Sequence, residues 1–127
     1  MERLKTGKIG ENASTTYLAQ KGYKIIERNC RLSFAEIDVV ARKGNTLVFV
    51  EVKTINDLAS GRRSSWNPED NLTSRKRFVL KRAALHYMNR LLQQGEAVFD
   101  VRIDVITIRL IGGGRATLRH YKNALSI

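Results

Sequence analysis

The sequence predicts an α/β fold in which helices flank a mixed β-sheet, in the element order α-β-β-β-α-β-β. Two segments carry apolar residues at helical spacing, and several shorter segments are rich in β-branched or alternating apolar residues. Glycine-containing turns separate many of these segments. The chain has 127 residues, of which 43% are hydrophobic and 28% charged, so we expect one globular domain over residues 1–127.

The first helix is predicted over residues 6–20. Its apolar stripe comprises Ala13, Tyr17 and Leu18. Gly22 stands just beyond it, at a position where glycine commonly ends a helix. The next segment, residues 23–28, is short and rich in isoleucine, which predicts a strand.

A β-hairpin is predicted from strands over 36–42 and 46–54. Residues 43–45 read Lys-Gly-Asn and have the chemistry of a hairpin turn. Within the second strand, residues 47–50 are apolar on both faces. Because a half-exposed strand would alternate apolar and polar residues, we expect this strand to be central and buried.

The second half predicts a long connection, a helix and two strands. Residues 55–73 lack periodicity, and we expect a mobile loop there, since loops of this length are usually functional or disordered. A helix is predicted over 74–94. Its expected inner face comprises Phe78, Ala84, Leu85, Met88, Leu91 and Leu92. Strands over 101–110 and 116–121, joined by three glycines, complete the sheet.

The charge balance indicates a polyanionic partner. Lys and Arg total 23 against 12 Asp and Glu, which gives a net charge of +11. Such a surplus favours nucleic acid, because each phosphate contact releases condensed counterions. No stretch approaches the ~20 apolar residues that span a bilayer, and residues 1–5 lack the apolar core of a secretory signal. The single cysteine, Cys30, suits a reducing cytoplasm. We therefore expect a cytoplasmic protein that binds nucleic acid and no membrane.

The predicted hairpin register brings charged residues together. Asp38 falls directly opposite Glu51, and Lys53 lies two residues further along the same face. Facing carboxylates ~5 Å apart repel one another, and burial adds several kcal/mol per charge. A divalent cation between them removes this cost, because hard oxygen ligands at such spacing suit Mg²⁺. Lys53 is then placed to touch a phosphate oxygen or the attacking water.

Each of these residues has a simpler explanation as well. Lys53 would form an ordinary ion pair with Glu51 or Glu36 at the edge of the sheet. Glu11 lies seven residues before Leu18, so it projects toward the buried face of the first helix. It is equally well explained as a first-turn carboxylate that stabilises the helix dipole.

Basic residues cluster in the long loop and at the start of the second helix. They are Arg62, Arg63, Arg75, Lys76, Arg77, Lys81 and Arg82. Cations at a helix N-terminus oppose its dipole, so we expect the cluster to contact the phosphates of a nucleic acid; the alternative is a solvated face. Trp66 is predicted either to stack on an unpaired base, worth ~1–3 kcal/mol, or to anchor the loop.

Three further polar residues receive weaker predictions. We expect His86 to be structural, because it falls between apolar helix positions. His120 is a candidate general base, although nothing in the sequence places it near Asp38. Asp104 is expected to be an exposed strand carboxylate, with support of the site as the alternative.

Several motifs resemble those of the small bacterial YraN family, and together they cover nearly the whole chain. They are Gly10-Glu11, Gly22-Tyr23-x-Ile25-Ile26-x-Arg28-Asn29-x-Arg31, Glu36-Ile37-Asp38, Phe49-Val50-Glu51-Val52-Lys53, Asp104-Val105-Ile106 and His120-x-x-Asn123-Ala124. That family is similar to archaeal Holliday-junction resolvases within the PD-(D/E)xK nucleases. The resemblance implies a restriction-endonuclease-like three-layer α/β/α core and metal-dependent phosphodiester cleavage, in many relatives by homodimers.

The resemblance also assigns residues. Asp38, Glu51 and Lys53 match the three signature positions, and Glu11 matches an acidic residue of the first helix that joins the site in resolvases. The implied ligands of Mg²⁺ or Mn²⁺ are Glu11, Asp38, Glu51 and the main-chain carbonyl of Val52. The leading hypothesis is thus a metal-dependent endonuclease that cleaves DNA, selective for branched or junction substrates. The alternative is a nucleic-acid-binding protein that keeps this fold without turnover.

The chain departs from the family's pattern at two places. Ala35 stands where the family usually has glycine before Glu-Ile-Asp. Residues 55–57 read Ile-Asn-Asp, where the family usually places an arginine shortly after Glu-x-Lys. The second departure removes an expected phosphate contact.

Overall fold

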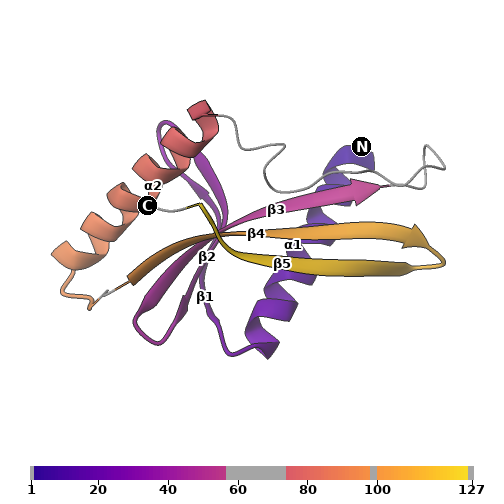
Figure 1. The fold of residues 1–127 in the computed structure, drawn as a ribbon, viewed down its shortest axis with the longest axis horizontal. Coiled ribbons are helices and arrows are strands. Elements are labelled where there is room, and N and C mark those ends of the chain that lie inside the picture. Colours follow the sequence, from indigo (N-terminus) through magenta and orange to yellow (C-terminus); the bar gives the residue numbers. More distant parts are fainter. Residues whose placement is uncertain (1, 57–73, 98–99, 126–127) are drawn as a thin grey trace.

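A computed structural model describes residues 2–56, 74–97 and 100–125. The elements are α1 (Glu2–Gln20), β1 (Lys24–Arg31), β2 (Glu36–Lys43), β3 (Thr46–Asn56), α2 (Ser74–Gln93), β4 (Asp100–Gly112) and β5 (Arg115–Leu125). Their order is the predicted α-β-β-β-α-β-β, so the α/β fold class is confirmed (Figure 1).

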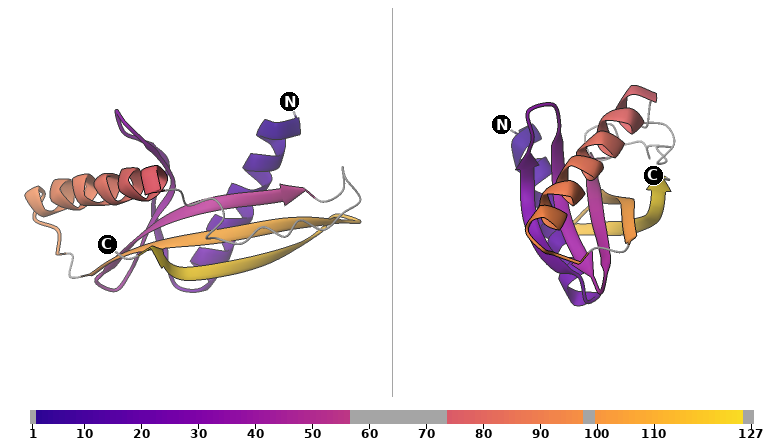
Figure 2. Two further views of the ribbon diagram at one scale, coloured as in Figure 1. Left: turned by 45° about the horizontal axis from the view of Figure 1, so that its top comes forward. Right: turned by 90° about the vertical axis from the view of Figure 1, so that its left-hand side faces the viewer.

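The five strands form one mixed sheet in the order β1-β2-β3-β4-β5. β3 and β4 are parallel, and the other neighbours are antiparallel. The helices pack on opposite faces, which makes three layers (Figure 2). Leu18 of α1 belongs to one buried cluster, whereas Leu80 and Tyr87 of α2 belong to the other.

The predicted hairpin register is confirmed. β2 and β3 pair from Lys43 opposite Thr46 to Val39 opposite Val50. Gly44 has a φ of 59°, in the left-handed region that a tight turn requires and that glycine adopts without steric cost. Residues 47–50 are all buried, so β3 is the central strand that the apolar run predicts.

Several boundaries differ from those predicted. α1 begins at Glu2 instead of residue 6, since no residue before Thr6 interrupts the helix. β3 continues to Asn56, and Ile55 is buried, because β4 pairs with β3 as far as Asn56. The start of the predicted loop over 55–73 is therefore wrong. Its remaining part, residues 57–73, lies outside the described residues.

The predicted inner face of α2 is partly wrong. The buried side chains are Leu80, Ala83, Ala84 and Tyr87. The predicted Phe78, Leu85 and Leu92 are instead 64%, 49% and 49% exposed. The aromatic ring of Tyr87 decides the rotation: it meets Phe49 edge to face at 5.6 Å, and its hydroxyl donates to Glu27 at 3.1 Å. Phe78, Leu85 and Leu92 recur every seven residues and therefore share one face of α2. When Tyr87 is buried, that face points toward solvent.

α1 approaches the sheet most closely at Gly10. A Cβ atom at this position would stand 1.9 Å from Oγ1 of Thr54 and 3.2 Å from its Cβ. Only glycine therefore lets the helix lie against β3 here. Because Glu11 is the next residue, the same close contact fixes where the Glu11 side chain leaves the helix.

We expect Gly10→Ala to lower the free energy of unfolding by about 1–3 kcal/mol, because the methyl group forces α1 away from Thr54. Gly7→Ala is the matched control. Nothing lies within 4 Å of a Cβ at Gly7, so the better helix propensity of alanine should raise stability by up to ~1 kcal/mol. Urea unfolding measures both, and adding Thr54→Ala should restore part of the loss. A Gly10→Ala variant as stable as the Gly7→Ala variant would contradict this packing.

Candidate active site

Asp38 lies where the ladder between β2 and β3 ends. The paired register stops at Val39 opposite Val50, one position short of the predicted Asp38–Glu51 pair. The Asp38 carboxylate instead accepts a hydrogen bond from the main-chain N–H of Val52 at 2.8 Å. The Asp38 side chain thus accepts a hydrogen bond that a main-chain carbonyl would accept in a continued ladder. The two strands can therefore separate beyond this point.

Two cavities meet at Asp38. The larger, of about 1020 Å³, is lined by Asp38, Lys53 and Glu11 together with residues of β1. The smaller, of about 170 Å³, lies against α2 and is lined by Glu36, Asp38, Glu51 and apolar residues. Asp38 therefore shares one cavity with Lys53 and the other with Glu51.

The pKa of Asp38 is raised from its usual 3.8 to about 6. Burial is the largest cause, and the hydrogen bond from Val52 opposes it. The negative charges of Glu51, Glu11 and Glu36 raise the pKa further. The Asp38 carboxyl group is therefore harder to ionise than a fully solvated aspartate.

Glu11 is held by β1. Its Oε1 accepts from Nε of Arg28 at 2.9 Å and from Nδ2 of Asn29 at 3.0 Å. Within residues 2–56, 74–97 and 100–125, no group of three His, Cys, Asp or Glu side chains lies close enough together to hold a metal ion. The predicted four-ligand set that includes Glu11 is therefore not assembled in this arrangement.

The smaller donor set still suits a hard cation. Mg²⁺ is usually bound by one or two protein carboxylates, with waters and substrate phosphates completing its octahedron. Asp38 and Glu51 line one cavity, and the negative charge of Glu51 disfavours that of Asp38. Two carboxylates in one cavity are donors of the kind that such an ion takes.

Basic residues missing from the predicted site line the larger cavity. They are Lys8, Arg28 and Arg31, in addition to Lys53. Composition gives no reason to select them among 23 Lys and Arg residues. The one available signal is that Arg28 and Arg31 fall within a motif of the YraN resemblance.

The predicted basic cluster is only partly described. On α2, Arg75 and Arg77 are exposed and Lys81 is half-buried, whereas the side chain of Lys76 lies outside the described part of the chain. So do Arg62, Arg63 and Trp66. Among the described lining residues of the two cavities, α2 contributes Val79 and Leu80 and no basic side chain.

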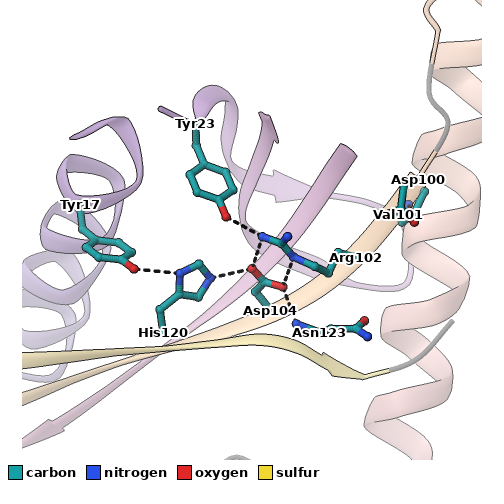
Figure 3. A network of polar contacts seen from close by, with 8 residues as sticks. All are labelled: Tyr17, Tyr23, Asp100, Val101, Arg102, Asp104, His120 and Asn123. Atoms are coloured by element: carbon teal, nitrogen blue, oxygen red, sulfur yellow. Dashed lines mark hydrogen bonds and ion pairs between the residues drawn. The ribbon is translucent and has the colours of Figure 1, made fainter. Parts of the chain in front are cut away.

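Asp104 is fully buried, so its prediction as an exposed carboxylate is wrong. Arg102 binds both of its oxygens, at 2.8 and 2.9 Å, and His120 contacts it at 2.6 Å (Figure 3). The main-chain N–H of Asn123 donates to it at 2.8 Å. Partners from β4 and β5 thus stabilise the Asp104 carboxylate in the core. The pattern of apolar and polar residues along a single strand does not reveal such partners.

The same network reaches α1. The hydroxyl of Tyr17 lies 3.0 Å from Nδ1 of His120, and Tyr23 accepts from Arg102 at 2.6 Å. The side chain of His120 is only 4% exposed and is engaged on both ring nitrogens. His120 therefore belongs to a structural cluster and not to the cavities around Asp38.

His86, which falls between apolar helix positions in the sequence, lies on the surface of the protein. It is exposed on α2 and meets the ring of Phe34 edge to face, with centroids 6.1 Å apart. Its apolar neighbours in sequence, Leu85 and Met88, are themselves not buried, because the helix turns Tyr87 inward.

In the described part of the chain, no helix combines the length and the apolar character that crossing a membrane requires.

Comparison with known proteins identifies a family whose description names no activity. Residues 10–108 match the model of the uncharacterised protein family UPF0102, which confirms the predicted resemblance to the YraN family. A UPF0102 protein of Pelobacter propionicus is 41% identical over 125 residues, covering 96% of this chain and 83% of the relative. One from Moorella thermoacetica is 38% identical over 110 residues, covering 87% of this chain and 85% of the relative.

The solved structure of Pyrococcus furiosus SfsA in complex with Ca²⁺ shows a weak similarity. The TM-score is 0.42 at 15% identity, and the match covers 99% of this chain but only 65% of the SfsA chain. A likeness at this level says nothing about activity.

Asp38→Asn should stabilise the metal-free protein at pH 7.5 by about 2 kcal/mol, because a desolvated charge with a raised pKa opposes folding. The folded-state pKa of about 6 lies above the unfolded value of 3.8, so the advantage of the variant should shrink as pH falls through this window. Urea unfolding in chelator from pH 8 to pH 4 measures it, with the exposed Asp100→Asn as control. Equal stability of wild type and Asp38→Asn at pH 7.5 would contradict the assignment.

Asp104→Asn should lower the free energy of unfolding by about 3 kcal/mol at pH 7, because it leaves the Arg102 guanidinium without its buried counter-charge. Burial disfavours the Asp104 charge, but His120, Arg102 and Asn123 outweigh it and lower its pKa from 3.8. The stabilisation should therefore persist down to about pH 4 and disappear only under more acidic conditions. The same unfolding series checks this, and a loss no larger than that of Asp100→Asn would refute it.

Proposed function

Because the chain belongs to the uncharacterised protein family UPF0102, whose description names no activity, we propose its function from the site itself: metal-dependent endonucleolytic hydrolysis of nucleic-acid phosphodiester bonds, with DNA the favoured substrate. Branched or junction DNA is the favoured structural class, on the resemblance to resolvases. The YraN motifs and the geometry around Asp38 support this proposal in different ways, and the geometry carries more weight.

The position of Asp38 is the observation that carries the proposal. A half-buried carboxylate with a raised pKa meets Glu51 in one cavity and Lys53 in the other. Strained electrostatics of this kind cost stability, and they are characteristic of catalytic sites.

Asp38, Glu51 and the main-chain carbonyl of Val52 would hold the Mg²⁺ or Mn²⁺ ion. When bound, such an ion supplies hydroxide at neutral pH and neutralises charge at the reacting phosphorus. The Lys53 ammonium group would donate to a non-bridging phosphate oxygen, where negative charge builds up in the transition state. Lys8 and Arg31, in the same cavity as Lys53, would hold the phosphates on either side.

Binding without turnover is the second candidate function. It is favoured by one observation, namely that Glu11 is engaged by Arg28 and Asn29 and does not join Asp38 and Glu51. The net charge of +11 would support phosphate binding equally well in this case.

Cleavage assays separate the two candidates. We would incubate the protein with labelled linear, flapped and four-way DNA and with RNA, in Mg²⁺, Mn²⁺ or chelator. We expect metal-dependent cleavage by wild type and a loss of about 100-fold or more in Asp38→Asn and Lys53→Met at matched binding, because each removes a group that acts in the transition state. Lys24→Met, which removes an exposed charge from β1, is the control and should cut like wild type.

Two results would count against catalysis. If wild type and variants bind the substrates equally and none cuts, the protein is a binding module. If calorimetry also detects no uptake of Mg²⁺ or Mn²⁺, the metal site is wrong as well. Asp38→Asn combines a gain in stability with a loss of cleavage, and this combination distinguishes a functional carboxylate from a merely structural one.

A further inference from the structure

Glu11 is held at a distance from the other acids by a small set of donors on β1. Arg28 and Asn29 both donate to its Oε1, at 2.9 and 3.0 Å, and a second nitrogen of Arg28 donates to Oδ1 of Asn12. The side chain of Glu11 is only 15% exposed, whereas that of Arg28 is 40% exposed. The carboxylate is thus enclosed, and the guanidinium that covers it can be reached from solvent.

The backbone of β1 is adapted to this contact. Asn29 has a φ of 50°, in the left-handed region that asparagine adopts more readily than other non-glycine residues. Its neighbours Arg28 and Cys30 pair with Val39 and Ile37, so Asn29 falls opposite Asp38. The donors that hold Glu11 are therefore built beside the central residue of the proposed site.

Arg28 also faces the cavity where the substrate would lie. Glu11, Arg28, Asp38 and Lys53 line the same space of about 1020 Å³. A phosphodiester in that cavity would compete with Glu11 for the guanidinium, because carboxylate and phosphate bind the same fork of N–H donors. The competition matters for Asp38, since the charge of Glu11 already acts on it.

We propose that Arg28 exchanges one partner for another: when a nucleic-acid phosphate binds its guanidinium group, Arg28 releases the carboxylate of Glu11. The freed carboxylate then joins Asp38 and Glu51 around the metal ion. This inference rests on the proposed function and explains why the expected ligand set is incomplete in the substrate-free protein. Nucleic acid and metal consequently bind with positive coupling, and each strengthens the other by the same factor.

The coupling is measurable without any cleavage. Calorimetry would follow Mn²⁺ binding to the free protein and to its complex with a phosphorothioate duplex, which resists hydrolysis. For wild type, we expect the duplex to tighten Mn²⁺ binding about 10-fold. For Arg28→Gln, the free protein should already bind Mn²⁺ about 10-fold more tightly than free wild type, and the duplex should add little.

Two further variants isolate the exchange. Glu11→Gln should abolish the coupling, and Arg28→Gln should no longer tighten Mn²⁺ binding when combined with it. Arg31→Gln is the matched control: Arg31 lines the same cavity, so the variant should weaken duplex binding, but it should leave Mn²⁺ binding to the free protein unchanged.

The outcomes distinguish this inference from the proposed function. If wild type binds Mn²⁺ and cleaves but Arg28→Gln binds Mn²⁺ no more tightly, the exchange is refuted and the nuclease proposal stands. If Arg31→Gln tightens Mn²⁺ binding as much as Arg28→Gln, general charge reduction explains the effect and the exchange is again refuted. If no form takes up Mn²⁺ and none cleaves, both fail together.

Discussion

The hydrogen bond from the main-chain N–H of Val52 to the carboxylate of Asp38 is the contact on which the site depends. A main-chain donor that is partly shielded from water needs an acceptor, and here a charged side chain provides it where β2 and β3 part. Strand separation would otherwise leave the Val52 amide without its partner in the sheet. The side chain that accepts this hydrogen bond therefore also lines both cavities.

The position of α1 follows from two other contacts, one near each end of its packed surface. Gly10 lets the helix touch Thr54, and Tyr17 ties it to His120 and the Asp104 cluster. Glu11 lies between these points, so its carboxylate can change partners while the helix itself stays in place. A side-chain exchange on a fixed helix requires far less reorganisation than the movement of an element.

The sequence predicts best what is encoded locally. The turn at Gly44 fixes the β2–β3 register, and hence the neighbourhood of Asp38 and Glu51. Prediction from the sequence fails where contacts between distant elements determine which side chains are buried or paired. Burial of Tyr87 against Phe49 sets the rotation of α2, although Phe78 and Leu85 offered an equally apolar face. The contacts of Arg28 and Asn29 with Glu11 join positions 17 and 18 residues apart on different elements, and no periodicity within either element records them.

The Asp104 cluster has a consequence for how this protein can vary among species. Arg102 and His120 both contact the one buried carboxylate of Asp104, so the loss of any of the three side chains leaves the others without a partner they now have. Single substitutions there pass through an unstable intermediate, whereas a joint replacement by apolar residues need not. Descendant lineages should consequently retain the three residues together or have exchanged them as a unit, which is a form of epistasis imposed by the interior of the fold.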